Sequence, residues 1–452
     1  MSQLSKIKQI YCCSTCGHTT GKWLGRCPNC NEWNSFIEKK ESLLSKTDSF
    51  KISNPAKLFT LDKIESDESD RMLSGISEWD RTLGGGILPG SFLILTGDPG
   101  IGKSTLLLQI ANKISTQYKV IYFSSEESLR QVQGRARRLK CNNTKLLFSD
   151  ESTLENVIAT ALEEKPDLLI LDSIQNCSIE KTQTIPGTPA QLRESGFHLM
   201  RLAKENKISI LITGHITKDG HMAGPKLLEH MVDGVFYLQG EERWQTRILR
   251  SVKNRFGNIN EIGFFEMEES GLVPVEDINK QLLEETSEAP GAALISYVEG
   301  SRPIILELQA LSVPSKFGVP QRVVTGIDHK RVVLIAAILE KYLKVRLSSH
   351  DIFFKVSGGF KVTDSSIDLG IALALLSSYF QKPIKEKAVS MAEVSLTGQI
   401  KPTHQVNSCV KEVQKFGIKK IFIAKDQRIE TSIKTTRFRN VFELLNLFPE
   451  DV

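Results

Sequence analysis

GDPGIGKST, at residues 97–105, is the stretch that decides the fold. It follows the apolar run FLILT at 92–96 and precedes the amphipathic run LLLQIANKI at 106–114. The stretch matches G-x-x-x-x-G-K-[ST], and a strand before it with a helix after it separates a true phosphate-binding loop (P-loop) from a chance match. Backbone N–H groups of such a loop and the dipole of the following helix bind phosphate oxygens. The stretch therefore predicts a nucleotide site.

The side chains of this loop have distinct expected roles. Lys103 is predicted to reach the β- and γ-phosphates of ATP as a catalytic residue, and Ser104 is predicted to bind Mg²⁺. The predicted nucleotide-binding residues are Gly97, Asp98, Pro99, Gly100, Ile101, Gly102, Lys103, Ser104 and Thr105.

Two acidic positions complete the predicted catalytic site. Asp172 ends the apolar run LLILD at 168–172 and is predicted to hold Mg²⁺ as a Walker B acid. Glu126 follows the run VIYFSS, which we expect to lie beside the P-loop strand, so its carboxylate is predicted to polarise the attacking water. The alternatives are a turn Asp at 172 and solvated acids at a helix start at 126–127.

The surrounding sequence, from residue 67 to about 275, alternates apolar runs with amphipathic stretches of helix length. Strands separated by helices predict a parallel sheet that is covered on both faces. The runs TRILRSVK and IGFFEM follow each other closely and predict antiparallel strands at one edge. Past a break at 284–290, further strands and helices predict a separate α/β unit.

Five of the eight cysteines lie in the first 30 residues. Cys13, Cys16, Cys27 and Cys30 form C-x2-C-x10-C-x2-C, and two such knuckles supply four thiolates for tetrahedral Zn²⁺. Cys12 breaks the spacing and is predicted to be spare. Because cysteine fills all four positions, the zinc is expected to be structural rather than catalytic.

Length and composition set the remaining bounds. The chain has 452 residues, of which 40% are hydrophobic and 25% are charged, as in ordinary soluble proteins with several domains. We expect a cytoplasmic protein with no membrane partner, since no apolar run approaches the roughly 20 residues of a membrane span. The net charge of +5 is too small to indicate a nucleic-acid partner by itself.

The ribbon cysteines, the run KWLGRCPNC, GDPGIGKST and the pentapeptide KNRFG at 253–257 together resemble the bacterial RadA family over essentially the whole chain. The resemblance implies a RecA-like ATPase that forms hexameric rings on single-stranded and branched DNA. It implies branch migration of recombination intermediates beside a RecA-type recombinase, and it makes Glu126 the catalytic glutamate. The predicted divisions are a zinc ribbon at 1–38, a flexible linker at 39–66, an ATPase domain at 67–285 and a final domain at 286–452.

The KNRFG element has two possible functions. Lys253 and Arg255 follow a strand and are predicted to face outward from a turn. In an oligomer they could reach the γ-phosphate bound by a neighbouring subunit, as an arginine finger does. They could instead contact DNA phosphates.

Two long connections are predicted to contact DNA, namely residues 176–190 and 217–230. They carry Lys181, Lys218 and Lys226, which could neutralise phosphates without recognising sequence. His215 ends the run ILITGH, where RecA-like proteins carry a nucleotide-sensing polar residue. Ordinary surface loops and a structural histidine are the alternatives.

The last domain resembles the Lon-protease fold in GGFKVTDSSIDLGIALALLSS and EVSLTGQIKP. The resemblance puts Ser366 at the nucleophile position, Asp368 where a glycine is usual, and Asn407 where the base lysine belongs. Asn cannot accept the serine proton, and Lys411 lies one helical turn further on, so we expect no Ser-Lys pair. A DNA-binding and ring-forming scaffold is favoured by seven basic residues: Lys316, Arg322, Lys330, Arg331, Lys344, Arg346 and Lys355.

Two rival functions remain at the level of sequence. One is an ATP-dependent protease of the Lon type, which the Asn at 407 disfavours. The other is a signalling ATPase of the circadian-clock type, which the zinc ribbon and KNRFG disfavour.

Overall fold

The computed structural model describes residues 8–41, 60, 71–143, 145–180, 185–215, 225–240, 246–316 and 318–449. Most of the predicted linker at 39–66 therefore lies outside the described residues. The chain forms two compact units, of which the first is built mainly from residues up to 239 and the second mainly from 273 onward. No helix in the described ranges is long and apolar enough to cross a membrane.

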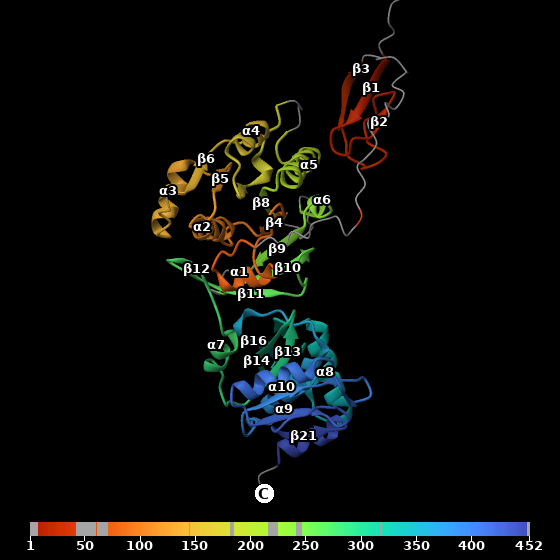
Figure 1. Cartoon of the computed structure of the whole chain (residues 1–452). Helices are drawn as coiled ribbons and strands as arrows, with labels where there is room; N and C mark the ends of the chain where they lie inside the picture. Colours follow the sequence, from red (N-terminus) through yellow and green to blue (C-terminus); the bar gives the residue numbers. More distant parts are fainter. Residues whose placement is uncertain are drawn as a thin grey trace, which may run out of the picture. The chain divides into compact units, whose positions relative to one another are not determined.

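The N-terminal cysteines lie on a small antiparallel sheet, drawn in red in Figure 1, with strand order β2-β1-β3. The strands are β1 (Lys8–Cys13), β2 (Thr19–Thr20) and β3 (Phe36–Glu41). The buried apolar cluster of this sheet consists of Cys13, Cys27 and Phe36, with Tyr11 and Cys30 packed against it. So small a core cannot hold a fold by burial alone, and a bound metal would supply most of the folding free energy.

A nine-stranded sheet of order β12-β11-β10-β9-β4-β8-β7-β5-β6 carries the P-loop. Strands β4 to β9 pair in parallel, whereas β10 and β11 pair antiparallel at one edge, as predicted. One expectation is wrong: β5, which precedes Glu126, is separated from the P-loop strand β4 by β8 and β7. The strands are β4 (Phe92–Gly97), β5 (Val120–Ser124), β6 (Leu146–Ser149), β7 (Leu168–Asp172), β8 (Ser209–His215), β9 (Gly234–Gln239), β10 (Thr246–Asn254), β11 (Ile262–Glu268) and β12 (Gly271–Pro274).

Helices pack on both faces of the parallel strands, which are buried along their length in β4, β5 and β7. Helix α2 contacts β4, β5 and β7, while α5 contacts β4 and β8 together with a cluster that includes residues of α4. The prediction of a covered parallel sheet is confirmed. The helices are α1 (Ser77–Thr82), α2 (Lys103–Ile114), α3 (Leu129–Arg138), α4 (Leu154–Glu164), α5 (Pro189–Asn206) and α6 (Pro225–Leu228), with a 3₁₀ turn η2 (Ile174–Asn176).

The second unit contains a seven-stranded mixed sheet of order β15-β16-β14-β13-β17-β20-β21. Helices α8 and α9 contribute to the larger buried cluster, and α10 contributes to a second cluster formed with β13, β17 and β20. This agrees with the predicted α/β unit. Its strands are β13 (Ala292–Glu299), β14 (Arg302–Pro314), β15 (Arg322–Thr325), β16 (His350–Val356), β17 (Ala388–Met391), β18 (Glu393–Val394), β19 (Ile400–Lys401), β20 (Lys420–Ala424) and β21 (Lys434–Phe438).

The helices of this unit are α7 (Ile278–Glu284), α8 (His329–Leu343), α9 (Asp368–Tyr379) and α10 (Val406–Lys415). The unit also contains short 3₁₀ turns: η3 (Leu347–Ser349), η4 (Ser357–Gly359), η5 (Ser365–Ile367) and η6 (Val441–Leu447). Helix α9 is buried along nearly its whole length, which explains its continuous apolar sequence.

Candidate nucleotide and metal sites

The P-loop joins β4 to α2 through backbone conformations that favour glycine. Gly97, Gly100 and Gly102 have φ angles of 155°, 77° and 115°. A Cβ added at Gly97 would lie 2.2 Å from the carbonyl oxygen of Leu238, so a larger residue cannot fit there without moving the neighbouring strand. The loop therefore has the open backbone cradle that a chain of phosphates requires.

Lys103, the first residue of α2, is buried with 5% of its surface exposed. Its Nζ donates hydrogen bonds to the carbonyl oxygens of Gly97 at 2.9 Å and Asp98 at 3.0 Å. Burial lowers the pKa of this ammonium, whereas the nearby charges of Asp172 and Glu126 oppose that shift. The three predicted catalytic groups thus lie within electrostatic range of one another.

Asp172 ends β7 and is fixed by hydroxyl groups from two other strands. Its Oδ2 accepts a hydrogen bond from the Tyr122 hydroxyl of β5 at 2.8 Å, and its Oδ1 accepts one from Thr213 Oγ1 of β8 at 2.6 Å. Burial and the adjacent carboxylate raise the pKa of Tyr122 well above its usual value, so this phenol stays a donor. The Asp172 carboxylate is therefore held in one orientation.

The two glutamates after β5 differ in their partners. Glu127 forms a bidentate ion pair with Arg135 of α3, with both N···O distances at 2.6 Å. Glu126 is exposed, and its Oε1 accepts a hydrogen bond from Ser173 Oγ, next to Asp172. Glu127 is held by α3, whereas Glu126 lies close enough to act electrostatically on Lys103 of the P-loop.

The KNRFG pentapeptide forms a turn that is fastened to the ATPase core. Asn254 is buried, and its Nδ2 donates to the carbonyl oxygen of Leu83 at 3.0 Å. The backbone N–H of Arg255 donates to the carbonyl oxygen of Asp233 at 3.0 Å. A Cβ added at Gly257 would lie 3.0 Å from Gly84 Cα, so the close approach of the two backbones needs glycine.

Only one of the two cations in this element faces outward as predicted. Arg255 has 57% of its side chain exposed and reaches Asp233 at 3.4 Å. The expectation is wrong for Lys253, because its Nζ donates to the carbonyl oxygens of Glu229 and Val232, the latter at 2.8 Å. Lys253 therefore tethers the chain around residues 229–232 to β10.

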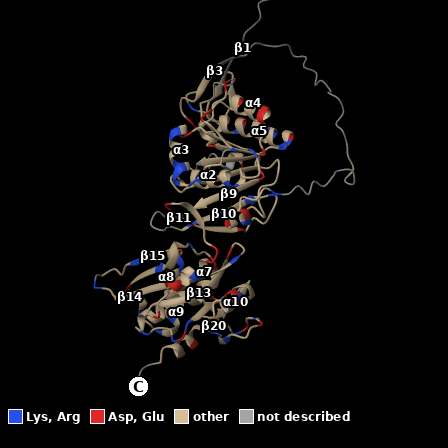
Figure 2. Cartoon of the chain, turned by 60° about the vertical axis from the view of Figure 1, so that its left-hand side comes forward, with Lys and Arg blue, Asp and Glu red and all other residues tan. Residues whose placement is uncertain are grey.

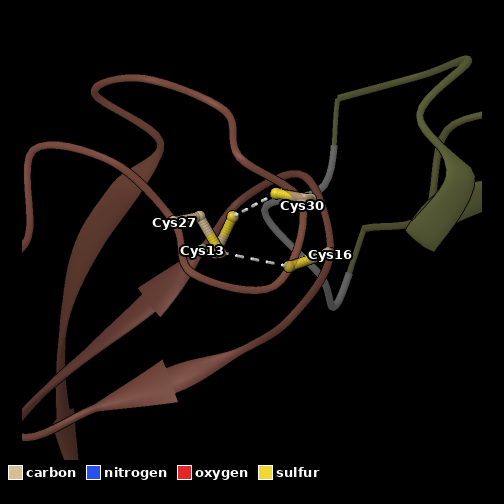
Figure 3. Close-up of side chains that lie close together, drawn as sticks. All are labelled: Cys13, Cys16, Cys27 and Cys30. Atoms are coloured by element: carbon tan, nitrogen blue, oxygen red, sulfur yellow. Dashed lines mark hydrogen bonds between the residues drawn. The ribbon is translucent and has the colours of Figure 1, made fainter.

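The four ribbon cysteines converge, and their Sγ atoms all lie within 4.8 Å of one another (Figure 3). Both knuckles have the same backbone bonding: Gly17 N donates to Cys13 O and Asn31 N donates to Cys27 O, each at 2.9 Å. Gly17 and Asn31 both have positive φ, at 76° and 61°. Such paired turns place four thiolates as a tetrahedral Zn²⁺ site requires, whereas Cys12 Sγ lies against the carbonyl oxygens of Cys13 and Gly17.

Three relatives match almost the whole chain. DNA repair protein RadA of Listeria monocytogenes is 42% identical over 94% of this chain and 94% of its own length. DNA repair protein RadA of Bacillus subtilis is 41% identical over 93% of both chains, and that of Streptococcus pyogenes serotype M6 is 42% identical over 94% of both. The chain belongs to the RadA family of DNA repair proteins.

Family models place three modules in this RadA-family chain. The ATPase model KaiC matches residues 72–277, the rubredoxin metal binding domain matches 11–38, and subunit ChlI of Mg-chelatase matches 318–427. The predicted RecA-like ATPase core, zinc ribbon and Lon-like C-terminal domain are confirmed. ATP with Mg²⁺, and Zn²⁺ at the cysteine cluster, are the cofactors of such a protein.

Several predicted DNA-contacting groups of this RadA-family chain lie outside the described residues. Lys181 and Lys218 fall in undescribed segments, and the side chain of Lys226 is likewise not described. The side chain of His215, which was predicted to sense the nucleotide, is not described either. In the C-terminal domain, Arg331 bonds Asp368 at 2.6 Å and Arg322 donates to backbone carbonyl groups. The other five predicted basic residues are exposed: Lys316, Lys330, Lys344, Arg346 and Lys355.

Ser366 lies in η5 with 6% of its surface exposed, and its Oγ has no hydrogen-bond partner among the described residues. Asn407 and Lys411 are both exposed on α10. Asp368 is buried in the ion pair with Arg331, so this position has a structural partner where a glycine was expected.

Three features of this RadA-family chain were not predicted from its sequence, namely the roles of Tyr122 and Thr213 and the arginines of α3. The signal for the first two was a polar residue inside an otherwise apolar strand, and for α3 it was the run QGRARR at 133–138. Arg130, Arg137 and Arg138 are exposed, and they contribute to the blue colour of α3 in Figure 2. These arginines place positive charge on the helix that follows Glu126.

Proposed function

We propose that this RadA-family ATPase is a DNA-dependent motor that promotes branch migration of recombination intermediates as a cytoplasmic hexameric ring. The observation that carries the proposal is the convergence of Lys103, Asp172 and Glu126 beside the glycine cradle. Lys103 Nζ bonds Gly97 O and is acted on by both carboxylates, and Glu126 bonds Ser173, the residue after Asp172. A lysine, a fixed carboxylate and an accessible glutamate are the groups that hydrolysis of a bound triphosphate requires.

Each group has a defined part in this proposal. ATP bound with Mg²⁺ would supply the transferred phosphoryl group. Lys103 would exchange its two carbonyl partners for phosphate oxygens, and Ser104 and Asp172 would hold the metal. Glu126 would accept the proton of the attacking water, with Ser173 holding its carboxylate in place.

Communication between subunits would run through KNRFG. Arg255 has the exposure that an arginine finger or a DNA contact needs. Lys253 would act by holding the chain at 229–232, at the C-terminal end of the predicted DNA-contacting segment 217–230. Lys253→Ala or Arg255→Ala should therefore uncouple ATP hydrolysis from DNA translocation without preventing nucleotide binding.

The flanking domains would organise the ring. We place the zinc ribbon at 1–38, a linker at 39–66, the ATPase domain at 67–285 and the Lon-like domain at 286–452. The Lon-like domain would bind DNA and form the ring through its exposed cations rather than cleave peptides. Single-stranded and branched DNA and a RecA-type recombinase are the proposed partners.

Branch migration on a labelled three-strand recombination intermediate tests this function. Wild-type protein with ATP and the recombinase should extend the heteroduplex, while Lys103→Ala should not, and sedimentation should give a hexamer. Equal extension by wild type and Lys103→Ala would reject the motor, and a protein that stays monomeric with ATP and DNA would reject the ring.

A further inference from the structure

Five segments of the Lon-like domain enclose a cavity of about 230 Å³. This volume is several times the roughly 30 Å³ that one water occupies in the liquid. The segments belong to β13, the start of η5 with the residue before it, the end of β17 with the start of β18, the loop at 402–405 and the first turn of α10. All of them lie within the second compact unit.

Buried hydroxyl groups line the floor of this cavity. Ser366 is more than nine-tenths buried, and Thr403 Oγ1 is buried although its residue is partly exposed. Neither hydroxyl has a hydrogen-bond partner among the described residues. Because a buried polar group without a partner is unfavourable, the presence of such hydroxyl groups in one cavity points to a ligand that satisfies them.

The charged groups at the cavity are acidic. Asp364 and Glu393 line it, and none of the described lining residues is Lys or Arg. Asp364 accepts a hydrogen bond from Ser366 N at 2.7 Å, and Glu393 accepts one from Ser365 Oγ at 3.4 Å. The nearby Arg331 acts on both carboxylates, but its guanidinium is bonded to Asp368 and to Thr363 O. Two carboxylates therefore oppose an anion and favour a cation.

The rest of the wall is apolar, since Val298, Met391 and Val406 line the same cavity. Burial raises the pKa of the lining thiol Cys409 to about 11, so it stays neutral at physiological pH. A hydrocarbon chain can lie on this wall while its charged end meets the oxygens. An ammonium group has three donors, which matches two hydroxyl oxygens and a carboxylate.

We propose that this cavity is a binding site for a primary alkylammonium group, either a free amine or the side chain of a lysine residue. Ser366 and Thr403 accept hydrogen bonds from the ammonium, Glu393 and Asp364 balance its charge, and the alkyl chain packs on Val298 and Met391. The site is independent of ATP hydrolysis. It assigns a binding role to a serine that has no base.

Calorimetric titration of the full-length zinc-loaded protein tests the proposal with four probes. The probes are 1,5-diaminopentane, the capped peptide Gly-Gly-Lys-Gly-Gly, neutral 1-pentanol and anionic pentanoate. Binding of the diamine alone would indicate a free amine as the natural ligand, and binding of the peptide would indicate a lysine side chain. Absence of binding by both amines, or equal binding of pentanoate, would overturn the proposal.

Two matched variants distinguish amine binding in the cavity from nonspecific attraction to negative charge on the domain. Glu393→Gln should weaken amine binding by about tenfold or more, as expected for loss of a charged hydrogen-bond partner. Glu430→Gln removes an exposed carboxylate of the same domain outside the cavity and should leave binding unchanged. Equal weakening by both variants would mean nonspecific attraction and would overturn the site.

Ser366→Ala provides a second readout. Because the serine hydroxyl has no partner to lose among the residues that the structure describes, its removal should leave the melting temperature unchanged or raise it, while amine binding weakens. A lower melting temperature with unchanged amine binding would show that the hydroxyl is structural, against the proposal.

Discussion

Asp172 and Ser366 are buried to nearly the same extent, at 4% and 6% exposure, yet their surroundings are opposite. Asp172 receives hydrogen bonds from two hydroxyl groups on other strands, whereas Ser366 Oγ has no hydrogen-bond partner among the described residues. The first is a carboxylate held in one orientation, and the second is a hydroxyl to which no base is bonded in the part of the chain that the structure describes. A buried carboxylate or hydroxyl is therefore evidence for a reactive site only where the groups that orient or activate it are also present.

Charge distinguishes the two regions in the same way. Around Asp172 a lysine, a glutamate and the helix start of α2 combine opposite charges, as a site for a metal-bound triphosphate needs. Around Ser366 the lining charges are the carboxylates Asp364 and Glu393. Mutations in the two regions should therefore affect different activities.

The largest effect is expected at the P-loop. Lys103→Ala should reduce ATP hydrolysis by about 10²- to 10³-fold, because it removes the positive charge that stabilises the transferred phosphoryl group. Steady-state phosphate release measures this, and circular dichroism should show an intact fold. Hydrolysis near the wild-type rate would mean that Lys103 does not act on the nucleotide.

The next largest effect is expected at Glu126 and not at its neighbour Glu127. Glu126→Gln should lower the hydrolysis rate by about 10²-fold through loss of a general base, with ATP binding retained. Glu127→Gln is the matched control, and it should mainly weaken the pair with Arg135. Single-turnover hydrolysis rates of the two variants show which glutamate is the general base. If Glu127→Gln is the slower enzyme, Glu127 and not Glu126 has that role.

A smaller effect is expected from the hydroxyl that holds Asp172. Tyr122→Phe removes one buried hydrogen bond to a carboxylate, so we expect a loss of about 1–3 kcal/mol in unfolding free energy. The Mg²⁺ concentration needed for half-maximal ATP hydrolysis should rise as well, because a less firmly held carboxylate binds the metal more weakly. Urea denaturation and a magnesium titration measure both, and a variant with unaltered stability and Mg²⁺ response would show that the bond has no positioning role.

The smallest effect on ATP hydrolysis is expected at the Ser366 cavity of the Lon-like domain. Ser366→Ala should leave both basal and DNA-stimulated rates unchanged. Wild-type protein should also fail to degrade casein with ATP. Robust ATP-dependent cleavage of casein that disappears in Ser366→Ala would show that Ser366 is a nucleophile and that the protein is a protease.

The strands, the P-loop and the cysteine cluster could be predicted because each is a local pattern. The partners of Asp172 could not, since Tyr122 and Thr213 meet it only through the strand order β8-β7-β5. Strand β5 was expected beside β4, but β8 and β7 lie between them. Spacing along the chain does not specify which parallel strands pair. Lys253 looked solvent-facing for a similar reason, as its carbonyl partners lie about 20 residues earlier.

The proposed motor should hydrolyse ATP at the P-loop at a rate that depends on bound DNA. The direct measurement is the ATP hydrolysis rate without DNA and with single-stranded, forked and duplex DNA, at increasing salt. We predict stimulation by single-stranded and forked DNA that declines steeply as salt rises, as the proposed contacts between several cations and DNA phosphates require. A rate that is the same with and without every DNA would contradict the account.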